Sequence, residues 1–524
     1  MSPAGTRPRV RFAYLVCVGV FLWAVAQFYA PATGFTSLIK IGDEISGRET
    51  TALRQLPHYV YDNSAGYDGA YYVQLALNPS LSNPELTTAI DNLPYRARRI
   101  LFCWVAWLAG LGQPGWIVQA HALLNVAVWL ALAVVLLRWF PATSWENFVR
   151  WLAVMFSHGL CMSVRDSLVD GPALLLVALA LAAEEEGKRV RGAALLAFAG
   201  LGRETSLLAV TGLAPDEPLK RQRPWWLFVG RAALVALPLL AWIGYIRWKF
   251  GPANDPGLGN FTLPLTGLVE KWRMTVEEIM RRSNSPLRWA TLGVTIGLTV
   301  QFLFFVLRWR PRDRWWRVGA TFAVLMMFLA TPVWEGLPGA AARALLPMTL
   351  AFNILVPRGR AWLAVLLVGN LTMVAAYHEF DPPVRDFFQI SGEAGVTVKA
   401  KSEPGVGWYD PENTASAHWR WSAGGGSLQV RNDSGRPLSL IIHGRAAAAQ
   451  DERRLRISAG QAMVWAGPLT AAPADFRFGF IAPPGETKLS FATDLPGHPI
   501  GKDERQMAFQ ILNLEIVAKP VPGQ

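Results

Sequence analysis

The chain has 524 residues, 52% of them apolar, and a formal net charge of +12. Its apolar residues recur in blocks of about 15–25, the length that crosses a bilayer core of about 30 Å, which excludes a soluble protein of this size. Lys and Arg cluster at the ends of these blocks and form no separate basic domain. The charge therefore reflects membrane topology, and nucleic acid is not an expected partner.

The first apolar block spans residues 12–30 and follows Arg7, Arg9 and Arg11. A cleaved signal peptide would have a shorter apolar region and a cleavage site of small residues, for which Ala30-Pro31-Ala32 is a poor match. The pattern predicts an uncleaved first span with the N-terminus in the cytoplasm.

A first external loop is predicted over residues 31–97, and it contains the sequence Tyr-Asp-Gly-Ala-Tyr-Tyr at positions 67–72. Asp68 is either a functional carboxylate or the N-cap of a helix over residues 69–77. Two other acids of the loop are weaker candidates for the functional role: Asp43 and Asp62.

Aromatic and cationic side chains accompany this carboxylate. The aromatic residues, Tyr67, Tyr71 and Tyr72, either line a sugar site or belong to an interfacial aromatic belt. The cationic residues close the loop: Arg96, Arg98 and Arg99. A guanidinium stays charged and its fork matches phosphate oxygens, so at least one of the three is expected to bind a phosphate. Contact with lipid head groups alone is the alternative.

The apolar blocks predict about nine full spans. They lie near residues 12–30, 115–139, 147–163, 170–185, 225–247, 287–307, 317–331, 341–357 and 361–377. Residues 98–112 are too short, and 192–213 are interrupted near Arg203, so both are expected to be juxtamembrane or re-entrant helices. With the basic clusters in the cytoplasm, this count places Asp68, a second loop over 249–286 and everything after about residue 378 outside.

Three groups of charged residues interrupt the apolar part after the first loop. Charges at mid-bilayer cost roughly 2.5–3.5 kcal/mol each, so they are usually functional or paired. The groups are Arg165 with Asp166 and Asp170, then Arg203 with Glu204, then Trp334 and Glu335 with Arg343. We expect them to share a cavity with Asp68 and to line the substrate or bind the donor phosphate. Structural ion pairing between helices, or an arginine that snorkels to the interface, is the alternative.

From about residue 400 the apolar pattern changes to period two. Phe476, Phe478 and Phe480 alternate with polar or small residues, and so do Leu512, Leu514 and Ile516. Short strands separated by turn sequences predict a β-sandwich over residues 386–524, after a membrane domain over 1–385. Three tryptophans of this region either stack on sugar rings or belong to the sandwich core: Trp408, Trp419 and Trp421.

The Tyr-Asp-Gly-Ala-Tyr-Tyr motif resembles the first-loop aspartate motif of GT-C fold glycosyltransferases, and it is similar to that of the GPI-anchor mannosyltransferases and their bacterial relatives. The Arg165-Asp166-Ser167 and Arg203-Glu204-Thr205 segments also resemble features of bacterial members. The resemblance covers residues 10–380. It implies inverting transfer of a sugar from a polyprenyl-phosphate donor to a glycan, lipid or protein acceptor, with Asp68 as general base. It also implies transfer at the outer face of the membrane, and a bacterial plasma membrane is the expected location.

The chain departs from the family pattern in having one convincing acid in the motif, where the family has an acidic pair. That gives no support for bound Mg²⁺ or Mn²⁺, and we expect no required cofactor. Arginines can stabilise the departing lipid phosphate without a metal. Two other functions remain open: a flippase for a lipid-linked glycan, and a non-catalytic polysaccharide assembly protein.

Overall fold

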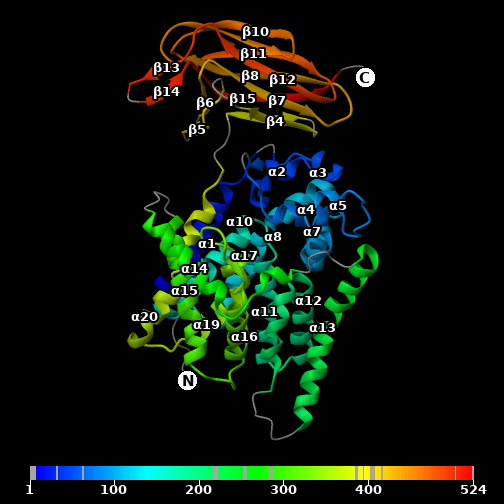
Figure 1. Ribbon diagram of the computed structural model, residues 1–524, viewed down its shortest axis with the longest axis vertical. Coiled ribbons are helices and arrows are strands. Elements are labelled where there is room, and N and C mark those ends of the chain that lie inside the picture. The colour runs from blue at the N-terminus through cyan, green and yellow to red at the C-terminus, as the bar shows by residue number, and fades with distance from the viewer. Residues whose placement is uncertain are drawn as a thin grey trace. The chain divides into compact units, whose positions relative to one another are not determined.

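The computed structural model describes residues 8–30, 33–61, 64–215, 222–251, 257–281, 287–383, 387–392, 395–401, 407–414, 417–501 and 503–521. The chain divides into a helical unit (Met1–Phe28, Phe35–Arg48 and Val60–Asp381) and a strand-rich unit (Tyr29–Gly34, Glu49–Tyr59 and Pro382–Gln524). Figure 1 colours most of the helical unit from blue to yellow and the strands from yellow to red. Asp62 and the side chain of Asp43 lie outside the described part.

Helices of very different length build the helical unit. The four longest are α1 (Pro8–Ala26), α8 (Pro114–Val135), α13 (Gln222–Phe250) and α15 (Leu287–Leu307). Helices of 8–16 residues are α4 (Gly69–Leu77), α7 (Leu101–Ala109), α9 (Trp145–Met155), α10 (His158–Arg165), α11 (Asp170–Glu185), α12 (Arg189–Gly202), α14 (Thr266–Met280), α16 (Arg314–Phe328), α19 (Leu346–Leu355) and α20 (Arg360–Gly369).

One-turn α-helices and 3₁₀ helices connect the longer ones. The one-turn helices are α2 (Asp43–Ser46), α5 (Leu86–Ala89), α6 (Leu93–Arg96), α17 (Thr331–Trp334), α18 (Ala341–Ala344) and α21 (Met373–Ala376), with α3 (Thr51–Arg54) in the strand-rich unit. The 3₁₀ helices are η1 (Thr36–Ile39), η2 (Ala97–Arg99), η3 (Leu136–Arg138), η4 (Glu204–Leu213), η5 (Leu258–Asn260) and η6 (Tyr377–Phe380). A two-stranded parallel ribbon joins β1 (Ile41–Gly42) to β2 (Val60–Tyr61) within the first loop.

Among the described residues, four helices are long and apolar enough to cross a membrane, or five if the bent pair Arg360–Gly369 and Met373–Phe380 is one span. The long helices α1, α8, α13 and α15 coincide with four of the predicted spans. Elsewhere the predicted spans are broken or short: residues 147–163 form α9 and α10, separated at Phe156-Ser157. A full set of nine spans therefore stays a prediction. The interruption of residues 192–213 is confirmed, because α12 ends at Gly202 and η4 follows at Glu204.

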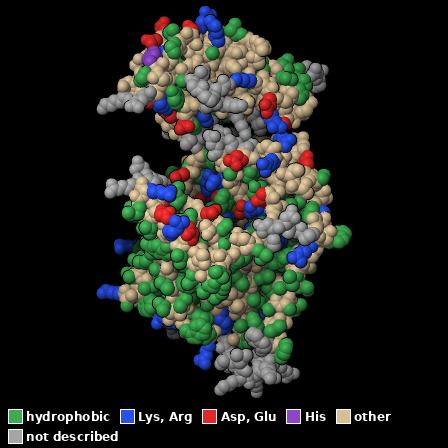
Figure 2. Space-filling model, in the orientation of Figure 1, with side chains coloured by type: hydrophobic (Ala, Val, Ile, Leu, Met, Phe, Trp, Pro, Cys, Tyr) green, Lys and Arg blue, Asp and Glu red, His purple; other side chains and the backbone are tan. Residues whose placement is uncertain are grey.

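The surface of the helical unit is consistent with its composition. Figure 2 shows many hydrophobic side chains on the visible face of this unit; its acidic side chains gather toward one end together with some basic ones, and further basic side chains lie along the margin and at the other end. Exposed apolar residues such as Phe12, Leu15 and Trp23 lie along α1. In contrast, Phe21 on the same helix is buried and stacks on Trp129 of α8, with ring centroids 3.7 Å apart. Apolar side chains that face outward as well as inward are typical of helices that meet lipid.

The strand-rich unit is a two-sheet sandwich. One sheet has the strand order β10-β9-β12-β7-β4, and the other has the order β11-β8-β15-β6-β5 with β3 paired to β15. The strands are β3 (Phe388–Gly392), β4 (Val396–Lys401), β5 (Glu412–Asn413), β6 (His418–Ser422), β7 (Gly425–Asn432), β8 (Leu438–Ala448), β9 (Arg453–Ala459), β10 (Ala462–Leu469), β11 (Ala474–Ala482), β12 (Gly485–Thr493) and β15 (Phe509–Pro520), with β13 (His498–Ile500) and β14 (Asp503–Met507) as a separate hairpin.

Alternation along the strands is confirmed. Phe476 and Phe478 of β11 are buried, as are Leu514 and Ile516 of β15, whereas their neighbours face outward. Trp408 belongs to the core: it is 5% exposed, and its indole Nε1 donates to the Ser427 carbonyl at 3.0 Å. Trp419 and Trp421 of β6 are half-buried and lie on the face opposite the buried Ser422. The sandwich core is therefore built by the period-two pattern, with one tryptophan inside it.

Candidate active site

Asp68 directly precedes α4, but its side chain does not cap that helix. Its backbone is helical (φ −51°, ψ −31°) and its carboxylate makes no cap hydrogen bond. The helix start is satisfied by the backbone instead, because the amides of Tyr71 and Tyr72 donate to the Asp68 carbonyl at 3.0 and 3.2 Å. The capping alternative is wrong, and the carboxylate is available for other partners.

Gly69 explains why the motif has a glycine after the aspartate. A Cβ at this position would lie 2.1 Å from the Asp166 carbonyl oxygen and 2.8 Å from the Ile39 carbonyl oxygen. Real Cβ atoms do not approach backbone so closely, so only glycine fits without a shift of the chain. The start of α4 is thereby held directly against the turn between α10 and α11.

That turn is itself fixed by buried hydrogen bonds. Asn125 of α8 donates to the Leu168 carbonyl at 2.8 Å, and the Ser163 hydroxyl donates to the Asn125 side-chain oxygen at 3.0 Å. The Gly171 amide donates to the Ser163 hydroxyl at 2.8 Å. A buried and satisfied polar network of this kind has one arrangement, so Asp170 at the start of α11 is placed with little freedom.

Arg96 joins Asp68 to a second acid of the first loop. Its Nη1 lies 2.9 Å from Asp68 Oδ1. Its Nε and Nη2 donate to Asp91 at 3.0 and 2.8 Å, a bidentate pair. The Arg96 guanidinium also lies over the Tyr71 ring, 5.0 Å from its centroid. One arginine of the predicted cluster is therefore ordered by two carboxylates and an aromatic face.

Two further arginines, distant in sequence, meet at Asp170. Arg203 forms an ion pair with Asp170, and Arg343 Nη1 lies 3.4 Å from the other carboxylate oxygen. The same Nη1 is 3.8 Å from Asp68 Oδ2, and Arg343 Nη2 donates to the Tyr67 hydroxyl at 3.0 Å. Arg343 thus bridges the first-loop motif and the start of α11.

A close backbone contact brings Arg343 to this place. Gly159 of α10 lies so near α18 that a Cβ there would be 2.4 Å from the Ala342 carbonyl oxygen. The one-turn helix α18 therefore packs directly on α10, and Arg343 extends from it toward the motif. The placement depends on a contact between residues about 180 positions apart, which no local pattern predicts.

Arg99 forms a separate pair behind this group. Its Nε and Nη2 donate to the Glu204 carboxylate at 2.8 and 3.2 Å. Two tyrosine hydroxyls accept its other donors, that of Tyr72 at 3.0 Å and that of Tyr95 at 2.9 Å. The Arg98 guanidinium lies over the Tyr95 ring, 4.9 Å from its centroid. Glu204 is thus the counter-ion of Arg99, so the first loop is tied to the break between α12 and η4.

Asp166 is the most buried acid of the group. Its side chain is 0% exposed, and it faces Lys40 Nζ at 3.6 Å and Arg165 Nη1 at 3.8 Å. Arg165 in turn donates to the Tyr61 hydroxyl at 2.8 Å. Asp170 is 1% exposed, whereas Asp68 is 22% exposed. Among these three carboxylates, Asp68 is therefore the one within reach of a ligand.

Charge and burial act on Asp68 in opposite directions. Burial raises the pKa of its carboxyl, but the guanidinium groups of Arg96, Arg343 and Arg99 outweigh burial and hold the pKa below its usual value. Burial raises the pKa of Tyr67 to about 12, against the opposing charge of Arg343. At neutral pH the site therefore holds a carboxylate beside a protonated phenol.

Among the described residues, no hydrogen bond or ion pair joins Trp334 or Glu335 to this group of ion pairs. Trp334 is 1% exposed and belongs to the apolar core, and Glu335 after it is exposed. Lys271 of α14 donates to the carbonyl oxygens of Trp334 and Gly336, both at 2.9 Å, and so fixes the segment that follows α17. A role for Trp334 and Glu335 in lining the substrate stays a prediction.

Three residues of the group were missed in the sequence: Lys40, Asp91 and Tyr95. Asp91 has a signal, since it precedes Arg96 by five positions in a loop that folds through α6, where the Asn92 side chain caps the helix start. Lys40 has a left-handed backbone (φ 55°) and gives no comparable signal. In the described part of the chain, no three His, Cys, Asp or Glu side chains are placed to hold a metal ion. Metal-independent action stays a prediction.

Comparisons with known proteins identify no family for this chain. No family model matches the sequence, and no curated protein matches it. A solved structure described as arabinosyltransferase EmbB from Mycobacterium smegmatis is 13% identical over 96% of this chain, with a TM-score of 0.30, and this chain covers 64% of that one. Another, titled "CBM4 structure and function", is 12% identical over 22% of this chain and 79% of that chain, with a TM-score of 0.15. Likenesses this weak establish neither a shared fold nor a shared activity.

Proposed function

We propose that this protein is an inverting glycosyltransferase that moves a sugar from a polyprenyl-phosphate donor to a glycan, lipid or protein acceptor at the outer face of the bacterial plasma membrane. One observation carries the proposal. Asp68 is released from helix capping, partly exposed, and faced by arginines from two distant segments, Arg96 and Arg343. A carboxylate beside fixed guanidinium groups matches the needs of glycosyl transfer from a phosphate.

In the proposed reaction, an acceptor hydroxyl attacks the anomeric carbon from the side opposite the phosphate. The hydroxyl proton passes to the Asp68 carboxylate as the new carbon–oxygen bond forms. The bond from the anomeric carbon to the phosphate oxygen breaks, and its electron pair stays on the departing polyprenyl phosphate. One displacement inverts the configuration of the sugar.

The arginines supply charge where the leaving group develops it. Arg343 donates one hydrogen bond to the Tyr67 hydroxyl and lies between the carboxylates of Asp68 and Asp170. Arg96 is held by the carboxylates of Asp68 and Asp91. A guanidinium has five N–H donors, so each retains donors for phosphate oxygens while its position stays fixed. Donors fixed in advance stabilise charge at no cost of reorientation. Arg203 forms an ion pair with Asp170. In the proposed reaction its positive charge also stabilises the negative charge that develops on the leaving phosphate.

The test is Asp68→Asn in the full chain, reconstituted in vesicles with a short-chain polyprenyl-phosphate sugar. Loss of a general base typically lowers the rate by about 10²–10⁴-fold. We expect that loss in transfer with unchanged expression and thermal unfolding. Transfer at the wild-type rate would contradict the assignment of Asp68. A flippase would instead move labelled lipid-linked sugar across the vesicle membrane in wild type and form no new glycosidic bond.

A further inference from the structure

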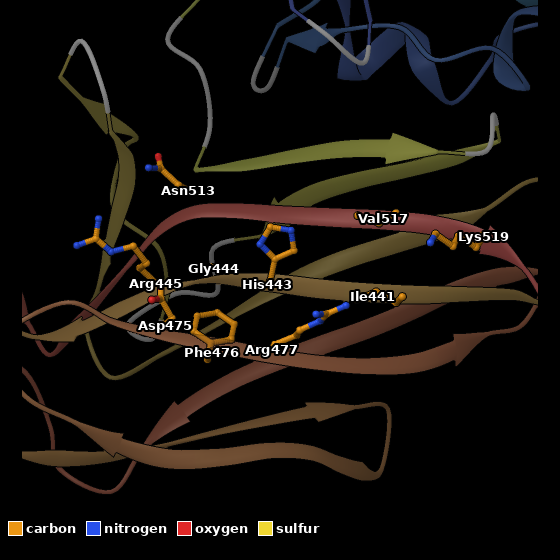
Figure 3. Close-up of a pocket in the computed structure, with 10 residues that line it drawn as sticks. All are labelled: Ile441, His443, Gly444, Arg445, Asp475, Phe476, Arg477, Asn513, Val517 and Lys519. Carbon is orange, nitrogen blue, oxygen red and sulfur yellow. The ribbon is translucent and has the colours of Figure 1, made fainter.

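A second polar depression lies on the sandwich, separate from the group around Asp68. It encloses about 570 Å³ on the outer face of the sheet that contains β8, β11 and β15. That volume falls within the roughly 300–1,000 Å³ of ligand pockets. Its lining includes Ile441, His443, Arg445, Asp475, Arg477 and Lys519, and Figure 3 shows their side chains. We call it the outer-sheet groove.

Strand register explains why these side chains meet. Arg445 of β8 pairs with Asp475 of β11, and His443 pairs with Arg477. Phe476 and Phe478, between and beside these β11 residues, face the core, so the charged residues share the opposite face. In Figure 3 the Arg445 and Arg477 side chains point toward opposite ends of the groove, with His443 between them.

The charge of the groove is positive. Arg445, Arg477 and Lys519 line it against one carboxylate, Asp475. His443 is already engaged, because its Nε2 lies 2.9 Å from Glu515. In the described part of the chain, none of the three cations forms an ion pair, and all three are exposed. Their donors therefore face solvent and are open to an anionic ligand.

The other lining residues indicate which class of anionic ligand the groove suits. Phe476 is 5% exposed, and the exposed imidazole ring of His443 is held by Glu515 at 2.9 Å. The lining therefore offers no exposed Phe, Tyr or Trp ring of the kind on which nucleic-acid bases stack. Its apolar members, Ile441 and Val517, are half-buried, which gives little surface for a lipid chain. Asp475 provides an acceptor for hydroxyl groups among the cations. One carboxylate acceptor among three cations suits a chain that carries both hydroxyls and acid groups.

We infer that the outer-sheet groove binds an acidic oligosaccharide, held by its carboxylates at Arg445, Arg477 and Lys519 and by its hydroxyls at Asp475. This inference rests on the proposed function, since an enzyme that extends or modifies a glycan gains from a second hold on the acceptor. It adds a substrate class: an acceptor with acid groups. Binding in the groove takes no part in the chemical step at Asp68.

The test measures binding of polygalacturonate oligosaccharides to the full chain in neutral detergent, beside the methyl-esterified form of the same oligosaccharides. We expect the wild type to bind the acid form at least tenfold more tightly than the ester. The variant R445Q/R477Q should lose at least tenfold in affinity for the acid form. The matched control R454Q/R456Q removes two exposed arginines from β9 in the other sheet and should bind as the wild type does.

Equal binding of acid and ester, or an equal loss in both double variants, would overturn the groove assignment. The two proposals fail separately. If Asp68→Asn loses transfer while wild-type protein does not prefer the acid oligosaccharide, the groove assignment falls and the enzyme proposal stands. If the groove binds as expected but Asp68→Asn transfers sugar normally, the base assignment falls and the binding site stands.

Discussion

The group around Asp68 and the outer-sheet groove treat charge in opposite ways. Around Asp68, arginines and acids neutralise one another at close range, and Asp166 and Asp170 are almost fully buried. In the groove, three exposed cations lie beside the exposed Asp475, and none of these four side chains forms an ion pair in the described chain, whereas the neighbouring His443 pairs with Glu515. Buried charge must be paired where it lies, so it fixes geometry, whereas exposed charge is held ready for a partner. This difference predicts how each region responds to substitution.

The largest effect is expected from Asp170→Asn. It leaves Arg203 and Arg343 without their shared carboxylate in a buried place, and breaking a buried pair typically costs about 3–5 kcal/mol. We expect a large fall in thermal unfolding temperature in detergent, with transfer lost because Arg343 is no longer held. Asp475→Asn is the control in the groove: an exposed acid without an ion pair should change stability by about 0.5 kcal/mol or less. Similar losses in both variants would remove the distinction between the two regions.

The next effect concerns Gly69. Gly69→Ala places a methyl group against the Asp166 carbonyl, and overpacking of this kind costs about 1–3 kcal/mol. We expect lower stability together with reduced transfer, because Asp68 moves with the start of α4. Gly115→Ala in α8 is the matched control, since nothing lies within 4 Å of its added Cβ, and alanine there should be neutral or stabilising. The measurements are the thermal unfolding temperature and the transfer rate of both variants. Equal values for Gly69→Ala and Gly115→Ala would contradict the close contact at Gly69.

These substitutions also show what the sequence can and cannot predict. Local pattern predicts α1, α8, α13 and α15 and the alternating strands of the sandwich, because periodicity and length are properties of neighbouring residues. It also singles out Asp68 beside Gly69. It does not predict that Gly159 lets α18 approach α10, or that Arg343 then reaches Tyr67. Pairings such as Arg99 with Glu204 arise only when distant segments pack, so the partners of each charge emerge from the fold.

A moderate effect on pH dependence is expected from Arg96→Gln. In the proposed reaction Asp68 is the general base and must be deprotonated to accept a proton, and Arg96 helps to keep its pKa low. An opposite charge within about 4–6 Å typically lowers a carboxyl pKa by about 1–3 units, so its removal should raise the pKa of Asp68 and move the acid limb of kcat/KM to higher pH. Activity would then be lost at a less acidic pH than in the wild type.

The control for this shift is Arg98→Gln, because the Arg98 guanidinium lies over Tyr95, away from the contacts of Asp68. Its acid limb should match that of the wild type. If Arg96→Gln lowers the rate equally at every pH, Arg96 acts on the donor and not on the pKa of the base.

The smallest expected effect is that of ionic strength. It distinguishes the exposed charges of the groove from the buried charges around Asp68, and it needs no further variant. Raising ionic strength from about 0.1 M to about 1 M shortens the Debye length from about 10 Å to about 3 Å. With so short a Debye length, the exposed cations of the groove lose most of their attraction for the carboxylates of the ligand. Polygalacturonate should therefore bind the groove about tenfold more weakly. Buried pairs are screened much less, so the difference in unfolding temperature between wild type and Asp170→Asn should hardly change. Groove binding that withstands salt would mean that hydroxyl contacts, and not the three cations, hold the oligosaccharide there.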